Sequence, residues 1–130
     1  MPNPVVHFEI ITSDPDALGE FYKKIFDWDV DAMHPGAGAG DVQKYIMARP
    51  DGQQPPPAGI NGGFGGLPPG YGGHVTFYIA VDDVGATLDR IEKSGGTRMM
   101  GPERVPGGPE IGLFTDPQGH TIGLVKNEAM

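Results

Sequence analysis

The sequence predicts an α+β fold of two βαβββ modules, whose curved mixed sheets form a cup with the helices on the outside. A strand pattern followed by a helix with an acidic N-cap occurs twice, first after VVHFEIIT and again after HVTFYIAV. Further short strand patterns follow each helix, and a segment rich in Pro and Gly separates the two halves. The repeat is too long for a solenoid and indicates a duplicated module.

Composition narrows the classes of function. The chain has 130 residues, enough for one domain with a core or for two small modules that share one. Its formal net charge of −8 argues against nucleic acid and anionic membranes as partners, because both require a basic face. Without cysteine, a metal site would need His, Asp or Glu ligands. No secretion signal or membrane span is visible, so we expect a cytoplasmic location.

The first strand pattern places polar residues on one face. Side chains alternate along a strand, so Val6, Phe8 and Ile10 share the face that would pack into a core. His7 and Glu9 lie on the opposite face. These two residues are therefore the first candidates for a functional site.

A helix is predicted directly after this strand. Asp14 is suited to the N-cap and Pro15 to the first helical position. Apolar residues then recur at helical spacing and predict one buried stripe, formed by Leu18, Phe21, Tyr22 and Ile25.

The remainder of the first half contains three weaker strand patterns, DWDVDAM, DVQKYIMAR and PAGINGGF. The stretch from Gln53 to Gly73 is rich in Pro and Gly, which favours extended, irregular backbone, and its second half is interpreted as a connector. We expect a single domain, with module one at about residues 1–64, a connector at about 65–73 and module two at about 74–130.

The second half repeats the order of the first. The strand HVTFYIAV precedes a helix within DDVGATLDRIEKSGG, with Val84, Leu88 and Ile91 on one face and a stop at Ser94 to Gly96. Three short strands, TRMMG, EIGLFTD and HTIGLVKN, complete this half, and the turn DPQG joins the last two.

The first strand of each half can be aligned residue by residue, VHFEI with VTFYI. His7 then corresponds to Thr76 and Glu9 to Tyr78. If the two sheets pair, these four residues face a common concave surface, which predicts a cleft.

Four segments carry a resemblance to a known family. The strand VVHFEI, the helix SDPDALGEFYKKIFDW, the segment FYIAVDDVGATLDRIEKSGG and the hairpin LFTDPQGHTIGLV together resemble the glyoxalase / bleomycin-resistance / extradiol-dioxygenase superfamily, which has the vicinal oxygen chelate fold. The likeness covers nearly the whole chain except the connector. This fold carries many activities, so the resemblance implies the fold more directly than the function.

The resemblance also implies where a metal would bind. Metal-dependent members bind a divalent ion with His and Glu side chains from strands of both modules, and His7 occupies the first of these places. The next two places fall on Thr76 and on Gly123, and His74 lies two residues before Thr76. Glycine offers no ligand, so we expect no cofactor; a rearranged set of His7, Glu9 and His74 is the alternative that would hold a divalent metal.

Each candidate residue has two interpretations. Glu9 would act as a general base or as a hydrogen-bond acceptor for a ligand, or it would form a salt bridge with Arg98, Arg104 or Lys44. His7 either has a function in the pocket, or it only hydrogen-bonds inside a polar cavity or lies exposed to solvent.

The remaining candidates are less specific. Tyr78 and Thr76 either line the cleft or belong to packing. Asn61 lies near the point where the last strand of module one would contribute a polar group.

Two functions remain open from the sequence. The first is a glyoxalase/bleomycin-resistance-like protein that binds a small organic molecule in the cup without the metal. The second is a lyase, isomerase or dioxygenase that depends on a metal or on Glu9. A homodimer is expected in either case, and the modules would pair within one chain or swap between two.

Overall fold

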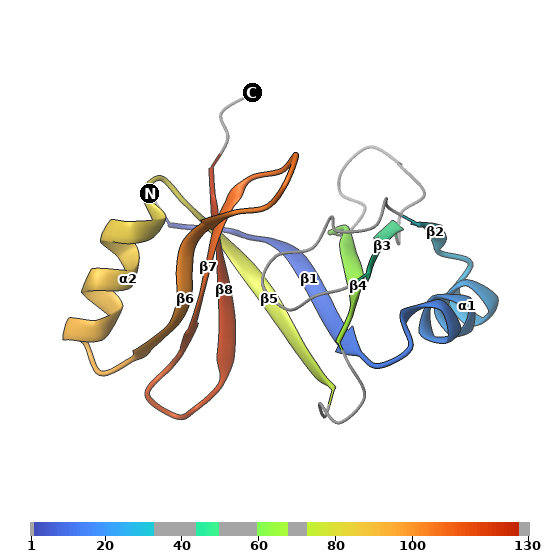
Figure 1. The fold of residues 1–130 in the computed structure, drawn as a ribbon, viewed down its shortest axis with the longest axis horizontal. Helices are drawn as coiled ribbons and strands as arrows, with labels where there is room; N and C mark the ends of the chain where they lie inside the picture. The colour runs from blue at the N-terminus through green and yellow to red at the C-terminus, as the bar shows by residue number, and fades with distance from the viewer. Residues whose placement is uncertain (1, 33–43, 50–59, 68–72, 128–130) are drawn as a thin grey trace. The chain divides into compact units, whose positions relative to one another are not determined.

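The structure is a computed structural model that describes residues 2–32, 44–49, 60–67 and 73–127 (Figure 1). Within these residues the element order is βαβββ followed by βαβββ, which confirms the α+β class and the duplicated module. The elements are β1 (Val5–Thr12), α1 (Pro15–Phe26), β2 (Asp29–Ala32), β3 (Lys44–Arg49), β4 (Gly62–Gly66), β5 (His74–Val81), α2 (Val84–Lys93), β6 (Thr97–Arg104), β7 (Glu110–Thr115) and β8 (Thr121–Lys126).

The chain divides into two compact units. The first unit contains His7–Val75, and the second unit contains Met1–Val6 together with Thr76–Met130. The strand β4 runs to Gly66, so the first two residues of the expected connector belong to the sheet of the first unit.

The sheet of the first unit has the order β2-β3-β4-β1. β4 is parallel to β1 and antiparallel to β3, and Phe8 pairs with Gly62 while Glu9 pairs with Gly63. Alternation therefore puts Phe8 and Phe64 on the face that packs against α1, and His7 and Glu9 on the other face. The sheet register thus positions the polar candidates away from the helix.

The caps of α1 agree with the sequence prediction. The carboxylate of Asp14 accepts a hydrogen bond of 3.0 Å from the Ala17 amide, and Pro15 is the first helical residue. The helix ends at Asp27, whose left-handed conformation lets its amide bond the carbonyl of Lys23 at 2.9 Å.

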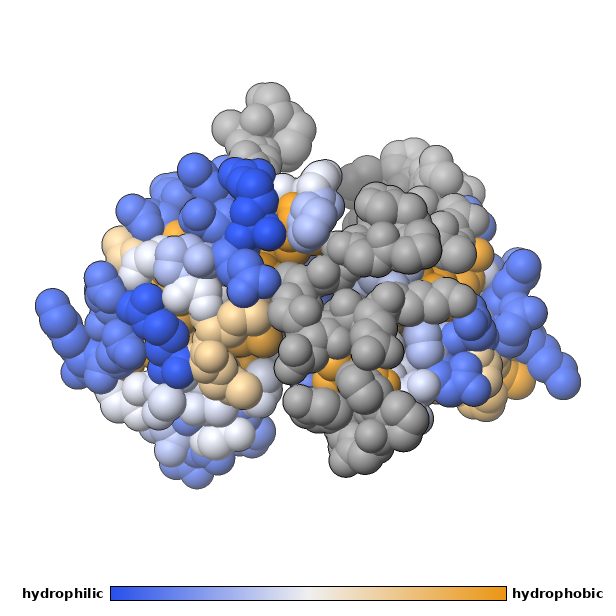
Figure 2. Space-filling model, viewed as in Figure 1, coloured by the Kyte–Doolittle hydropathy of each residue, from blue (hydrophilic) through white to orange (hydrophobic). Residues whose placement is uncertain are grey.

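The predicted buried stripe of α1 is wrong in half of its members. Leu18 and Tyr22 pack against the core around Phe64, but Phe21 and Ile25 are 53% and 55% exposed. Gly19 explains the difference, because a Cβ there would lie only 3.1 Å from Cγ1 of Val30, so the helix approaches the sheet along the line of Gly19. Figure 2 shows apolar patches among hydrophilic atoms at the end of the molecule that carries α1, and a mainly hydrophilic surface over α2.

Aromatic rings fill the space between α1 and its sheet. The Tyr22 ring lies 5.0 Å from that of Trp28 and 5.5 Å from that of Phe64, and Trp28 lies 5.6 Å from Phe8. Such ring contacts add about 0.5–1.5 kcal/mol each beyond the area they bury. This cluster stabilises the sheet on which His7 and Glu9 lie.

The second unit repeats this arrangement with the strand order β5-β8-β7-β6. β5 is parallel to β8, and the other neighbours are antiparallel. One face packs against α2 through a buried core formed by Val81, Val84, Leu88, Phe114 and Leu124. The predicted apolar face of α2 is confirmed, with Val84 and Leu88 buried and Ile91 partly buried.

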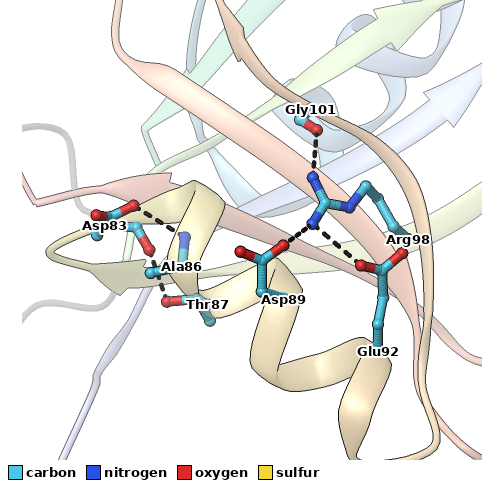
Figure 3. A network of polar contacts seen from close by, with 7 residues as sticks. All are labelled: Asp83, Ala86, Thr87, Asp89, Glu92, Arg98 and Gly101. Atoms are coloured by element: carbon cyan, nitrogen blue, oxygen red, sulfur yellow. Dashed lines mark hydrogen bonds and ion pairs between the residues drawn. The ribbon is translucent and has the colours of Figure 1, made fainter.

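A polar network joins α2 to β6 on the surface of the second unit (Figure 3). The Arg98 guanidinium contacts Asp89 at 2.5 Å and Glu92 at 3.1 Å, and it also donates to the carbonyl of Gly101 at 3.3 Å. At the start of the same helix Asp83 accepts from the amide of Ala86 at 2.9 Å, as an N-cap does. Arg98 thus links β6 to the second half of α2, and Asp83 caps the start of the helix.

The apolar face predicted for β1 is buried only in part, and the matching residues of β5 are also only partly buried. Phe8, Ile10 and Ile79 pack against the cores, whereas Val6 and Phe77 are about 40% exposed and Val75 is 71% exposed. The apolar clusters form around the later residues of β1 and β5, so alternation alone overestimates burial at the strand starts. In the described part of the chain no helix is long and apolar enough to cross a membrane.

Glycine packing beneath α2 gives a testable consequence. A Cβ on Gly112 would lie 2.9 Å from Cγ1 of Val84 and 3.0 Å from Cδ1 of Leu88, both fully buried. We expect Gly112→Ala to lower the free energy of unfolding by about 1–3 kcal/mol through overpacking, measured by urea denaturation.

Gly85 in α2 provides the matched control, since a Cβ there meets its nearest atoms at 3.6 Å. Gly85→Ala should raise the free energy of unfolding by about 0.5 kcal/mol, because it restricts the unfolded chain without a clash. Equal effects of the two substitutions would contradict the packing described for β7 and α2.

Candidate functional site

Three polar side chains meet on the face of the first unit that α1 does not cover. His7 and Glu9 come from β1, and Tyr45 comes from β3. The Nε2 atom of His7 lies 2.8 Å from the Tyr45 hydroxyl oxygen, and this hydroxyl donates to Oε2 of Glu9 at 3.3 Å. The structure therefore brings His7 and Glu9 together through a residue that the sequence analysis missed.

Glycines of β4 make this meeting geometrically possible. Tyr45 pairs with Gly65, and its ring leans along the strand to lie over Gly63, which pairs with Glu9. A Cβ on Gly63 would overlap the Tyr45 ring. Diagonal neighbours in a sheet are within reach of aromatic side chains, so Tyr45 spans β4 to contact residues of β1.

Burial controls the charge of the cluster. It lowers the pKa of His7 from 6.5 to about 4, because the charged imidazolium loses hydration. The ring is therefore neutral near pH 7, with one nitrogen as donor and the other as acceptor.

In the second unit the residues that correspond to His7 and Glu9 are Thr76 and Tyr78. Both are buried, and they contribute to packing and to hydrogen bonds with the backbone. Thr76 is 3% exposed, and its hydroxyl donates to the carbonyl of Thr121 at 2.5 Å. Tyr78 is 5% exposed and pairs with Gly123, where a Cβ would lie 2.5 Å from the tyrosine ring. An acidic side chain at position 123 would thus compete with Tyr78 for the same space.

The remaining candidates lie at the ends of strands. Asn61 is exposed, and its carbonyl accepts from the amide of Phe8 at 3.3 Å, so its backbone holds β1 against β4. His74 is exposed at the first residue of β5, and partial burial lowers its pKa. Neither is brought into the His7–Tyr45–Glu9 cluster by a hydrogen bond that the structure shows.

The salt-bridge interpretation of Glu9 is not supported by the arginines. Arg98 pairs with Asp89 and Glu92, and Arg104 donates to the carbonyl of Gly108 at 2.8 Å. The side chain of Lys44 lies outside the described residues. Glu9 does accept a hydrogen bond from the hydroxyl of Tyr45.

The described residues at the places that the resemblance implies do not form the expected set of metal ligands. Among the described residues, no three His, Asp or Glu side chains gather into a group able to hold an ion. The Thr76 hydroxyl is bound to a backbone carbonyl, and Gly123 offers no donor. A catalytic metal needs about three protein ligands, and this donor set does not supply them.

Tyr45 leaves only a weak signal in the sequence. Alternation along YIMA separates Tyr45 and Met47 from the buried Ile46 and Ala48, and so marks Tyr45 as facing away from the core. The sequence does not show which strand lies beside it, because that depends on the sheet register.

The chain forms two βαβββ units, each with one helix packed against its sheet, and a polar cluster lies on the first strand. This arrangement is the vicinal oxygen chelate fold. The sequence profile of the Glyoxalase/Bleomycin resistance protein/Dioxygenase superfamily matches residues 5–124. The chain belongs to this superfamily.

Curated relatives are longer than this chain. It is 34% identical over 121 residues to "Putative glyoxylase CFP32" of Mycobacterium tuberculosis, covering 89% of this chain and 42% of that protein. It is 28% identical over 134 residues to the anthracycline biosynthesis protein DnrV of Streptomyces peucetius, covering 99% and 49%. The chain thus spans less than half the length of these relatives.

Solved structures share the fold at low identity. Methylmalonyl-CoA epimerase of Streptomyces coelicolor, in complex with 2-nitronate-propionyl-CoA, superposes with a TM-score of 0.69 at 20% identity and covers 96% of this chain and 97% of its own. The epimerase of Mycobacterium tuberculosis gives 0.68 at 15% identity, covering 96% and 88%. These likenesses establish the fold.

The lowered pKa of His7 predicts a pH-dependent stability. Its folded pKa of about 4 lies below the unfolded value of 6.5, so the unfolded chain binds more protons between these values. The stability of the neutral, buried ring is present above pH 6.5 and is lost as the pH falls toward 4. We expect the free energy of unfolding to fall by up to about 3 kcal/mol over this range for this residue.

Comparison of the wild type with His7→Gln isolates the contribution of His7 to the free energy of unfolding, because the other histidines are present in both. Urea denaturation at several pH values should give a difference between wild type and variant that shrinks as the pH falls from 7 to 4. A difference that stays constant over this range would show that burial does not depress the His7 pKa.

Proposed function

We propose that this protein binds a small organic molecule on the open face of its first sheet, without the metal of metal-dependent superfamily members. The hydrogen-bonded cluster of His7, Tyr45 and Glu9 carries the proposal. These three side chains are half-buried on a face that no helix of their unit covers, beside a strand with glycines at positions 63 and 65. Small-molecule sites combine such polar groups with apolar surroundings.

The occupied positions of the second unit support the metal-free part of this proposal. Thr76 and Gly123 stand where the resemblance places metal ligands, and both have structural contacts instead. We therefore expect no cofactor. A homodimer and a cytoplasmic location stay predictions from the sequence.

Elemental analysis tests the absence of metal. Protein purified without chelators and incubated with Ni, Zn, Fe or Mn salts should retain well under about 0.1 equivalent of each after desalting, because His7 supplies one of the roughly three ligands required. Stoichiometric metal that is lost in His7→Gln would overturn the metal-free proposal.

Ligand binding is tested with molecules that the relatives suggest. Doxorubicin, an anthracycline, is a suitable probe because DnrV is named for anthracycline biosynthesis, and methylmalonyl-CoA is suitable because the structural neighbours are its epimerases. We expect one of them to shift amide resonances of β1 and β3 and to bind at least about fivefold more weakly to Glu9→Gln, a loss near 1 kcal/mol.

Thr87→Val serves as the control for this experiment. Thr87 lies on α2 and bonds only its own helix cap, so its loss should leave binding unchanged. Binding of both probes that is unaffected by Glu9→Gln would place the ligand elsewhere.

The Tyr45–Glu9 hydrogen bond also favours a second candidate, a lyase or isomerase that uses Glu9 as general base. A positioned carboxylate can remove a proton from carbon next to a carbonyl group. Such an enzyme would exchange the C2 proton of methylmalonyl-CoA for deuterium in D2O, and Glu9→Gln would lower this rate by about 100-fold or more. No exchange above the buffer rate would exclude this activity on that substrate.

A further inference from the structure

A cavity of about 800 Å³ lies within the second unit, beside the start of α2. Its walls are formed by residues 2–4, residues 80–83, one face of α2 that includes Ala86 and Arg90, and Asn127. This volume is in the range of sites for small molecules, about 300–1,000 Å³. The cavity therefore has the size to hold a ligand of its own.

Hydrogen bonds hold the walls of this cavity in place. The amide of Ala80 donates to the carbonyl of Pro4 at 2.9 Å, and the side chain of Asn3 donates to the carbonyl of Ala80 at 3.1 Å. The amide of Asn127 donates to the carbonyl of Val81 at 2.6 Å. Segments far apart in the sequence are thus fixed against the end of β5, so the cavity is preformed.

The charged groups of the cavity are separated along α2. Asp82 and Asp83 lie at the start of the helix, where Asp83 accepts from the amide of Ala86 as the N-cap (Figure 3). Arg90 lies about two turns further along the helix. In the part of the chain that the structure describes, the side chains of Asp82 and Arg90 form no hydrogen bond or ion pair. The cavity thus has a negative end and a positive end, each with a charge that the protein leaves unpaired.

The spacing of these charges restricts the ligand. A helix rises 1.5 Å per residue, so the start of α2 and Arg90 are about 10 Å apart along its axis. A ligand that contacts both ends must carry its cationic and anionic groups several bonds apart. The apolar residues Pro2, Pro4 and Ala86 also line the cavity, and they suit an aliphatic chain between the two charged groups.

We propose that this cavity binds linear zwitterions, molecules whose ammonium and carboxylate groups are separated by several bonds. The Asp82 carboxylate would accept hydrogen bonds from the ammonium group, and the Arg90 guanidinium would donate two parallel bonds to the carboxylate. Short peptides and ω-amino acids share this chemistry. The site belongs to the second unit and does not depend on the ligand proposed for the first sheet.

Four probes with the same six-carbon chain test this proposal: 6-aminohexanoate, norleucine, hexylamine and hexanoate. Norleucine has its two charges on adjacent carbons, and the last two probes each lack one charge. Titrations followed by the amide resonances of residues 82–90 and Asn127 should show 6-aminohexanoate bound at least about tenfold more tightly than each other probe, because each of these loses one charged hydrogen bond. Equal affinities for all four probes would overturn the proposal.

Two substitutions assign each charge of the ligand to a residue. Arg90→Gln should abolish the preference for 6-aminohexanoate over hexylamine and keep the preference over hexanoate. Asp82→Asn should do the reverse. Both side chains are exposed and unpaired, so neither substitution should change the midpoint of urea denaturation.

Lys93→Gln is the matched control, because it removes a positive charge from the last residue of α2, which is not among the residues that line the cavity. The preferences should stay unchanged in this variant. If none of the probes shifts the resonances of residues 82–90, or if both substitutions leave the preferences intact, the proposal is refuted. Such a failure would not affect the ligand site proposed for the first sheet, which is tested through the resonances of β1 and β3.

Discussion

Aromatic rings lying directly on glycines are the packing constraint on which this structure depends. The ring of Tyr45 lies over Gly63, and the ring of Tyr78 lies over Gly123. On the helical side, Phe8 lies over Gly62 in the same way. A side chain at any of these glycines would displace a ring, because protein interiors leave no room for an additional carbon.

This constraint also bears on the place where the resemblance puts a metal-binding glutamate. Tyr78 occupies the space that a longer side chain at position 123 would need, so the aromatic packing of the second unit and a glutamate at that place exclude one another. In the first unit the same kind of packing brings the Tyr45 hydroxyl to 2.8 Å from Nε2 of His7. His7 is thus neutral near pH 7, half-buried and hydrogen-bonded, which avoids the cost of an unsatisfied polar group.

Much of the architecture was predictable from local sequence patterns. The two strand–helix repeats, the caps at Asp14 and the stop after Ser94 follow from alternation, helical spacing and capping chemistry. The errors arose where burial depends on neighbours. Phe21 and Ile25 fit a helical stripe but are exposed, because Gly19 brings a different line of α1 onto the sheet.

The sequence by itself determined the superfamily, the face shared by His7 and Glu9, and the absence of a ligand at Gly123, since these depend on residue identity and on the alternation of side chains along one strand. Only the tertiary structure decided which group contacts His7 and Glu9. Tyr45 lies 38 residues from His7 in the chain, and the strand register that brings them together is set by the pairing of β1, β4 and β3. Register is a property of the whole sheet, so no single segment of the sequence contains it.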